Sequence, residues 1–313
     1  MSRSPLRRYR MRMQRVARDA EVAARVCDGV SMVPAVSRPG RTALTGNSRS
    51  PRAPGGGDTV TGVQTPSGAE ITFDGDVVVK LHRAGTDPRA LRTRLRVADA
   101  LPDILLAPST VAPERVGERW RSRWPCVQTI APQPAQLPWA DAGGVLARLH
   151  AQPVTARLLH GWPARLRRVV EHARRTEVTQ SVRRALTELP PAVWRAGSPD
   201  RPRTFVHGDF HLGQLGRRGP GRPWLLIDVD DLGVGDPAWD LARPAGFWAA
   251  GHLPDEDWST FLEAYRQGGG AALADAPADP WPVLDPFARA AVVAAAVHHP
   301  EDELLAAACA RMV

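Results

Sequence analysis

The sequence predicts an α+β protein of two lobes, a small β-rich lobe followed by a larger lobe that is mainly helical. Three observations predict this fold class. Short β-branched runs alternate with turn residues over 58–83, apolar residues recur at helical spacing from residue 139 onward, and a proline-rich joint at 132–138 separates the two regions. We therefore expect an N-lobe over 58–131 and a C-lobe over 132–313.

The first 57 residues differ in composition from the rest of the chain. They contain 12 arginines against three acidic residues and end in one proline and three glycines. Such a segment has too little apolar surface to fold alone, so 1–57 is predicted to be a disordered basic tail or the product of a mis-assigned start. Because this tail accounts for the formal net charge of +8, that charge does not indicate nucleic-acid binding.

The N-lobe is predicted to begin with three strands. They are expected over 59–64, 69–73 and 77–82, joined by turns at Pro66-Ser67-Gly68 and Asp74-Gly75. A helix should follow, because Asp87 before Pro88 is typical of an N-cap and a first helical position. Further strands are expected over 104–131.

The C-lobe is predicted to consist of helices interrupted by short strands. Helices are expected over 139–151, 161–175, 178–189, 237–250, 255–267 and 285–310, with a break at Pro300. Strands are expected at 204–206 and 224–229, and acidic residues follow both of them.

Several classes of protein are excluded by composition. The three cysteines are far apart and form no CxxC pair, which argues against a disulfide scaffold and against structural zinc. No apolar run approaches 18 residues, and the basic start is not followed by the apolar core of a signal peptide. We therefore expect a cytoplasmic protein that does not associate with membranes.

Two acidic residues follow the C-lobe strands. Asp209 stands in the segment 206–214, Asp228 stands in 225–231, and a turn sequence at 217–221 lies between them. A hairpin is therefore expected to bring both carboxylates close together. Two close carboxylates repel unless a cation or proton lies between them, and an oxygen-rich site without cysteine favours Mg²⁺ over zinc.

Lys80 is the single lysine among 41 basic residues, and it lies in the third predicted strand. In a chain that otherwise uses arginine, a single lysine indicates a site that needs a compact ammonium, which the planar guanidinium of arginine cannot replace. Phosphoryl transfer from ATP uses such a lysine for the phosphates, a carboxylate for the acceptor proton, and a carboxylate with an amide oxygen for Mg²⁺. Lys80, Asp209, Gln214 and Asp228 supply those groups in that order.

The segments HGDFHLGQ (207–214) and LLIDVDDLGVGDPAWDLA (225–242) resemble signatures of the aminoglycoside phosphotransferase family of kinase-like enzymes. The loop HGDxHLGQ is more similar to that of bacterial maltokinases than to that of the antibiotic kinases. The resemblance implies a bilobal protein-kinase-like fold. It also implies transfer of the γ-phosphate of ATP, or of GTP, with Mg²⁺, to a hydroxyl of a small molecule such as a sugar, an aminoglycoside or an amino alcohol.

The resemblance also implies a role for each matching residue. Asp209 matches the catalytic aspartate, Gln214 and Asp228 match the Mg²⁺ ligands, and Lys80 matches the lysine that binds the ATP phosphates. Ser67 and Gly68 occupy the nucleotide turn. Supporting roles fall to Asp236 and Asp240, which match a structural motif, and to His207, which we expect to hold the catalytic loop from a buried position. Asp230 and Asp231 are expected to be solvated turn residues, with a part in the metal site as the alternative.

Two departures from the family pattern lead to an alternative function. No glutamate occurs between Lys80 and Glu114, so the usual ion pair with the N-lobe helix has no obvious partner; Asp87 and Asp99 are shorter substitutes. The nucleotide loop contains only one glycine. A pseudokinase-type binding or regulatory module is therefore the alternative to a kinase.

The acceptor and the assembly are left open by the sequence. Residues 204–313 contain 16 acidic against seven basic residues, and on the acceptor side this surplus would suit a cationic or polyhydroxylated substrate. The oligomeric state is open.

Overall fold

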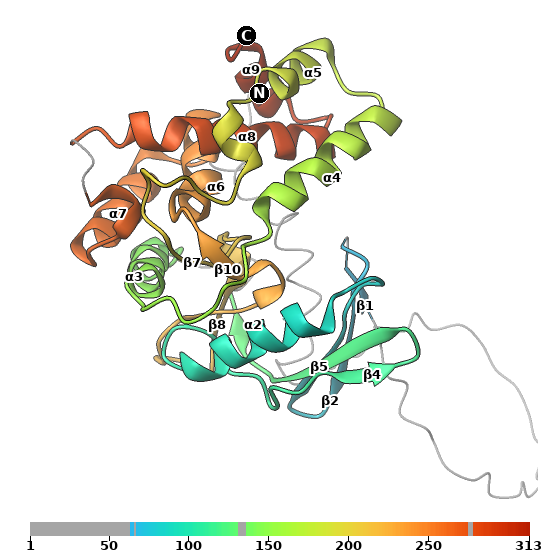
Figure 1. Ribbon diagram of the computed structural model, residues 1–313. Helices are drawn as coiled ribbons and strands as arrows, with labels where there is room; N and C mark the ends of the chain where they lie inside the picture. The colour runs from blue at the N-terminus through green and yellow to red at the C-terminus, as the bar shows by residue number, and fades with distance from the viewer. Residues whose placement is uncertain (1–62, 66, 131–135, 275–277) are drawn as a thin grey trace, which may run out of the picture.

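The computed structural model describes residues 63–65, 67–130, 136–274 and 278–313, and it has the predicted bilobal α+β fold (Figure 1). The predicted tail at 1–57 lies outside the described residues, as do the start of the first predicted strand and most of the proline-rich joint. Among the described residues, no helix is both long enough and apolar enough to cross a membrane.

The N-lobe contains an antiparallel sheet of five strands in the order β1-β2-β3-β5-β4. The strands are β1 (Val63–Gln64), β2 (Glu70–Asp74), β3 (Val77–Leu81), β4 (Glu114–Val116) and β5 (Arg119–Pro125). The predicted turn at Asp74-Gly75 is present: Asp74 pairs with Val77, and Gly75 has the positive φ of 59° that this tight turn requires.

Helix α2 (Pro88–Ala100) lies on the C-lobe side of this sheet, buries Leu91 and Leu95, and contacts the turn at 229–231 (Figure 1). The predicted N-cap is confirmed, because the Asp87 carboxylate accepts a hydrogen bond from the Arg89 amide at 2.9 Å. This capping occupies Asp87 and leaves it no role as a partner for Lys80.

The C-lobe is built from seven helices among the described residues. They are α3 (Trp139–His150), α4 (Trp162–Arg175), α5 (Gln180–Thr187), α6 (Ala238–Ala249), α7 (Asp255–Gln267), α8 (Trp281–His298) and α9 (Glu303–Ala310). The lobe's core lies where α6 packs on α8 and α3 packs on α7.

The helical segment expected over 285–310 begins earlier than predicted, and the break predicted at Pro300 is present. It begins at Trp281, because Pro282 in the first turn needs no amide partner there. It ends at His298 before Pro300, as that proline predicts. Asp302 then caps the start of α9, because its carboxylate accepts hydrogen bonds from the amides of Leu304 and Leu305.

Two small sheets carry the acidic residues between the lobes. Strand β7 (Thr204–Val206) pairs with β10 (Gly233–Gly235), whereas β6 (Gln128–Thr129), β8 (Leu215–Arg217) and β9 (Leu225–Leu226) form the order β6-β8-β9. The hairpin at 215–226 was predicted to join the strands that precede Asp209 and Asp228. That prediction is wrong, because β7, the strand before Asp209, pairs instead with β10, the strand that follows Asp231.

Candidate active site

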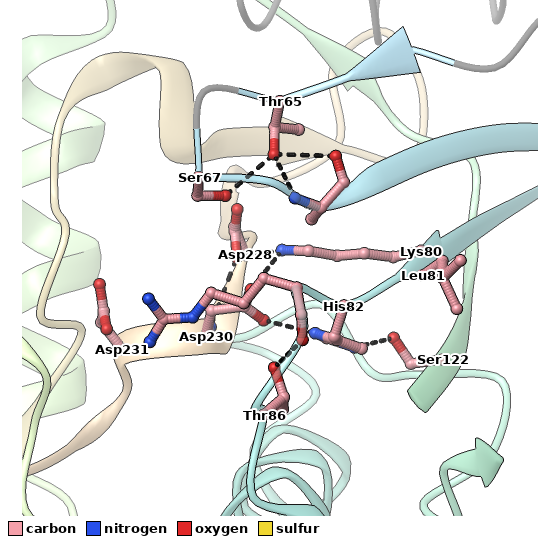
Figure 2. A network of polar contacts seen from close by, with 12 residues as sticks. Thr65, Ser67, Lys80, Leu81, His82, Thr86, Ser122, Asp228, Asp230 and Asp231 are labelled. Atoms are coloured by element: carbon pink, nitrogen blue, oxygen red, sulfur yellow. Dashed lines mark hydrogen bonds and ion pairs between the residues drawn. The ribbon is translucent and has the colours of Figure 1, made fainter. Parts of the chain in front are cut away.

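The ammonium of Lys80 connects the N-lobe sheet to the C-lobe. Lys80 is the last residue but one of β3 and pairs with Ile71 and Ser122 on the neighbouring strands, and only 7% of it is exposed. Its Nζ lies 2.7 Å from Asp228 Oδ1 and 2.9 Å from Asp230 Oδ2 (Figure 2). Burial opposes the charge, but both carboxylates outweigh it and raise the pKa of Lys80 above its ordinary value.

A buried histidine fixes the second of these carboxylates. His82 lies two residues after Lys80, so its side chain lies on the same face, and its Nδ1 is 3.2 Å from Asp230 Oδ1. Its Nε2 is 2.8 Å from Ser122 Oγ, which also accepts from Trp124 Nε1. A neutral ring that donates from Nδ1 to Asp230 accepts the Ser122 hydroxyl at Nε2.

Asp230 and Asp231 are therefore paired, and the prediction of solvated turn residues is wrong. Asp230 binds Lys80 and His82, and the charge of Lys80 lowers the pKa of its carboxyl in spite of burial. Asp231 binds Arg165 Nη2. The sequence shows that the N-lobe helix lacks a glutamate, but the substitutes it suggests, Asp87 and Asp99, are not the partners. A buried lysine needs a carboxylate, and Asp228 and Asp230 are the ones that reach it.

Asp228 has the geometry of a functional residue. It is the one described non-glycine residue with positive φ (60°), a backbone conformation that costs free energy in residues other than glycine, although aspartate tolerates it better than most. Its side chain is 40% exposed, and Oδ2 makes no hydrogen bond within the described residues. One oxygen of Asp228 is thus held by Lys80, and the other is open to a ligand.

Gln214 is paired through its backbone with the residue that precedes Asp228. The carbonyl of Gln214 accepts from the Ile227 amide at 2.9 Å, which places Gln214 across from the residue before Asp228. Its half-buried side-chain amide has no hydrogen-bond partner in the described part of the chain. A free amide oxygen and a free carboxylate oxygen are hard ligands of the kind that Mg²⁺ prefers, so these residues fit the metal that the family implies.

The turn between β1 and β2 is held by hydrogen bonds. Thr65 Oγ1 lies 2.9 Å from Ser67 Oγ and accepts from the Ala69 amide, while Gly68 has a φ of 84°. Arg119 binds the Gly68 carbonyl and Glu70, and its Nε donates to the His82 carbonyl. In the view of Figure 2 this turn lies above Lys80 and Asp228. Ser67 and Gly68 therefore belong to a hydrogen-bonded turn at the edge of the N-lobe sheet.

Asp209 lies in a separate ion-pair network. Its Oδ1 is 2.5 Å from Arg165 Nη1 on α4 and 3.1 Å from Arg243 Nη2 on α6. Burial raises the pKa of Asp209, but the two arginines more than offset it and lower that pKa to about 2. Arg165 also binds Asp231, so one guanidinium connects the loop of Asp209 to the segment of Asp228.

A buried aspartate holds the loop of Asp209 from behind. The Asp240 carboxylate is fully buried and accepts from the amides of His207 (2.6 Å) and Gly208 (2.9 Å), and it lies 3.1 Å from His150 Nε2. Gly208 has a φ of 81°, and a Cβ there would collide with the backbone of Asp231. Only glycine therefore allows the loop to turn so close to that segment.

The two remaining supporting residues have clear contacts. His207 is fully buried, and its Nε2 lies 2.8 Å from the Ile227 carbonyl, which ties the loop of Asp209 to the residue before Asp228. Asp236 accepts from the Ala238 amide at the start of α6 and pairs with Arg201 at 2.9 Å. These contacts are the structural ones that the sequence predicts for both residues.

The structure brings most of the predicted site residues to one region between the lobes. Lys80 and Asp228 are in contact, Gln214 pairs with the residue before Asp228, and Ser67 lies above Lys80 in the view of Figure 2. Asp209 contacts none of these residues and reaches them through Arg165 and Asp231.

The functional candidates that sequence reasoning missed are Asp230, His82, Arg165 and Arg243. The two arginines could not be recognised from the sequence, because the chain contains 40 arginines and nothing in the spacing of these two sets them apart.

Comparison with known proteins places these residues in a family. The model of the phosphotransferase enzyme family matches residues 68–287. No curated protein sequence matches the chain significantly. Solved structures with the same fold include the aminoglycoside phosphotransferase APH(3'')-Id from Streptomyces rimosus, which is 21% identical with a TM-score of 0.52 and covers 73% of this chain and 92% of its own.

Two further structures agree. An aminoglycoside-3'-phosphotransferase of type VIII is 18% identical with a TM-score of 0.50 and covers 73% of this chain and 93% of its own. The GDP complex of aminoglycoside 2'-phosphotransferase-IIIa is 14% identical with a TM-score of 0.50, and the match covers 81% of this chain and 89% of its own. The chain therefore belongs to the phosphotransferase enzyme family and is an enzyme that phosphorylates small molecules.

Proposed function

We propose that this enzyme transfers the γ-phosphoryl group of ATP or GTP, with Mg²⁺, to a hydroxyl group of a small molecule. The observation that carries the proposal is the buried Lys80 ammonium, 2.7 Å from the half-exposed Asp228, with Gln214 paired through its backbone carbonyl to Ile227, the residue before Asp228. These are the groups that bind nucleotide phosphates and their metal in phosphoryl transfer. A solved protein of the same fold is a GDP complex, which supports a nucleotide as the phosphoryl donor.

The proposed nucleotide site uses residues of both lobes. Lys80 binds phosphate oxygens from β3, and Ser67 with Gly68 covers the phosphates from the turn between β1 and β2. Asp228 and Gln214 would hold Mg²⁺, which when bound neutralises charge on the phosphates. Asp230 and His82 keep the ammonium of Lys80 in place without a glutamate in α2.

Asp209 is the proposed catalytic residue. The acceptor hydroxyl donates a hydrogen bond to its carboxylate, the hydroxyl oxygen bonds to the γ-phosphorus, and the bond from that phosphorus to the β–γ bridging oxygen breaks to leave ADP or GDP. The hydroxyl proton passes to Asp209. Because the transition state is loose, the proton moves late, and a weakly basic, ion-paired carboxylate is sufficient to orient the nucleophile.

Calorimetric titration with ATP and with GTP tests the nucleotide site. We expect binding that requires Mg²⁺ in the wild type, loss of that requirement and at least tenfold weaker binding in Asp228→Ala, and no change in Asp285→Ala, whose surface pair with Arg289 is remote. A wild type that binds neither nucleotide would overturn the proposal. Nucleotide binding without release of ADP or GDP in an acceptor screen would show instead a binding module.

A further inference from the structure

The charges around Asp209 have the opposite sign from those that the composition predicts. The acidic surplus of residues 204–313 favoured a cationic or polyhydroxylated acceptor. In the structure Asp209 is flanked by Arg165 from α4 and Arg243 from α6, and the exposed Arg168 lies one helical turn after Arg165 on the same face of α4. Figure 1 shows α4 starting near β10, so its first turns lie beside the catalytic loop.

Part of this positive charge has no counter-ion. The two acidic residues of this region, Asp209 and Asp231, are both bound to Arg165. Arg168, one turn further along α4, makes no hydrogen bond or ion pair within the described residues. Arg243 uses only Nη2, toward Asp209, and its other two nitrogens bind no described residue. Two guanidinium groups thus keep donor capacity beside the proposed base.

The other titratable groups near Asp209 do not offset the positive charge of the arginines. The pKa of Arg168 is lowered, first by burial and then by the charges of Arg83 and Arg165. Burial and Arg243 likewise lower the pKa of His211 to about 3, so this ring stays neutral and adds no proton. His172 on α4 and His298 on α8 stack with their centroids 5.0 Å apart, and the charges of Arg165 and Arg243 act on His298. An ammonium on the acceptor would meet repulsion here.

This positive charge is separate from the phosphate-binding lysine. Lys80 is neutralised by Asp228 and Asp230, and neither Arg168 nor Arg243 contacts any of those three residues. Arginine forks suit carboxylates and phosphate monoesters, whose two oxygens accept parallel hydrogen bonds. The donors that remain free on Arg168 and Arg243 therefore fit an anionic group on the acceptor rather than the nucleotide.

We propose that the acceptor carries an anionic group, a carboxylate or a phosphate monoester, next to the hydroxyl that is phosphorylated, and that Arg168 and Arg243 bind it. The inference rests on the proposed function, because it names the substrate class of the same site. It excludes acceptors whose recognition depends on ammonium groups.

Four compounds of one carbon skeleton test this proposal: glucose, glucosamine, gluconate and glucose 6-phosphate. Nucleotide binding is measured first, and binding of each compound is then titrated on the full chain saturated with Mg²⁺ and the analogue AMP-PNP. We expect gluconate or glucose 6-phosphate to bind at least tenfold more tightly than glucose, and glucosamine to bind most weakly. The stronger of the two anionic compounds distinguishes a carboxylate from a phosphate ester.

Two variants on α4 form a matched pair. Arg168→Gln should reduce the preference for the anionic compound over glucose about tenfold, and Arg174→Gln should leave it unchanged, because Arg174 pairs with Glu171 at the surface. Arg243→Gln should likewise reduce the preference for the anionic compound over glucose. If the protein binds nucleotide but binds the anionic compounds no more tightly than glucose, or binds none of the four compounds, this inference is overturned and the proposed function is not. An equal loss in Arg168→Gln for charged and neutral compounds overturns the inference too, whereas loss of nucleotide binding overturns the proposed function.

Discussion

Asp230 Oδ2 lies 2.9 Å from Lys80 Nζ, and Asp230 Oδ1 lies 3.2 Å from His82 Nδ1. A carboxylate of the C-lobe therefore holds two buried groups of one N-lobe strand. This contact supplies the partner that Lys80 lacks in α2, and it ties the position of the lysine to the segment that carries Asp228. The two lobes are thus joined at the place where the nucleotide phosphates are proposed to bind.

Asp230→Asn should weaken nucleotide binding. The amide cannot neutralise Lys80, so the lysine would pair with Asp228 alone, and Asp228 is also the proposed metal ligand. We expect the KM for ATP to rise about tenfold and the Tm to fall, as measured by steady-state kinetics and thermal unfolding. Asp74→Asn, at an exposed hairpin end, is the control. An unchanged KM in Asp230→Asn would show that the pair is dispensable.

The sequence predicted the parts of the fold that depend on local signals. The cap at Asp87, the turn at Asp74-Gly75 and the strand at 204–206 follow from turn residues, capping preferences and β-branched runs, and the structure has all three. The pairing of β7 with β10 could not be predicted in this way, because it joins segments almost 30 residues apart and depends on where the intervening hairpin folds.

The candidate site was predicted where residue types are rare and missed where they are common. Lys80 was recognisable because it is the single lysine, and Asp209 because it stands in a loop with a family signature. Arg165 and Arg243 look like all the other arginines of an arginine-rich chain. Their role depends on two helices meeting at one carboxylate, which no spacing in the sequence records.

Asp209→Asn should strongly reduce phosphoryl transfer while sparing the nucleotide site. The amide cannot take the hydroxyl proton, and Asp209 contacts neither Lys80 nor Asp228. We expect kcat to fall about 10²-fold or more with the Kd for ATP unchanged, measured by product release and by calorimetry. A variant that turns over at the wild-type rate would remove Asp209 from the mechanism.

The pH dependence of turnover should reveal the two arginines. Because Arg165 and Arg243 hold the pKa of Asp209 near 2, the carboxylate is deprotonated throughout the neutral and mildly acidic range. The wild type should therefore show no loss of kcat from protonation of Asp209 between about pH 5 and pH 8.

In Arg165→Gln the burial of Asp209 is opposed by one arginine fewer, so its pKa rises. An acidic limb should then enter the pH–rate profile at a higher pH than in the wild type. An identical acidic limb in both proteins would contradict this account.

Asp240→Asn should be strongly destabilising. The Asp240 carboxylate accepts from two backbone amides and lies 3.1 Å from His150 Nε2 in a fully buried position. Burial raises its pKa, but the hydrogen bond and charge of His150 outweigh burial and lower it, so the folded protein favours the ionised form. That stability is present above the ordinary pKa of an aspartate and is lost as the pH falls through the lowered value.

An asparagine at 240 would turn an NH₂ group toward donors that need an acceptor. We expect a loss of about 3 kcal/mol or more in the free energy of unfolding at pH 7, measured by urea denaturation. The Asp285→Asn control, which removes half of a partly exposed pair one helical turn apart, should lose less than about 1 kcal/mol. Equal losses in the two variants would mean that Asp240 does not hold the catalytic loop. The loop position of Asp209 would then have to depend on His207 and its bond to the Ile227 carbonyl.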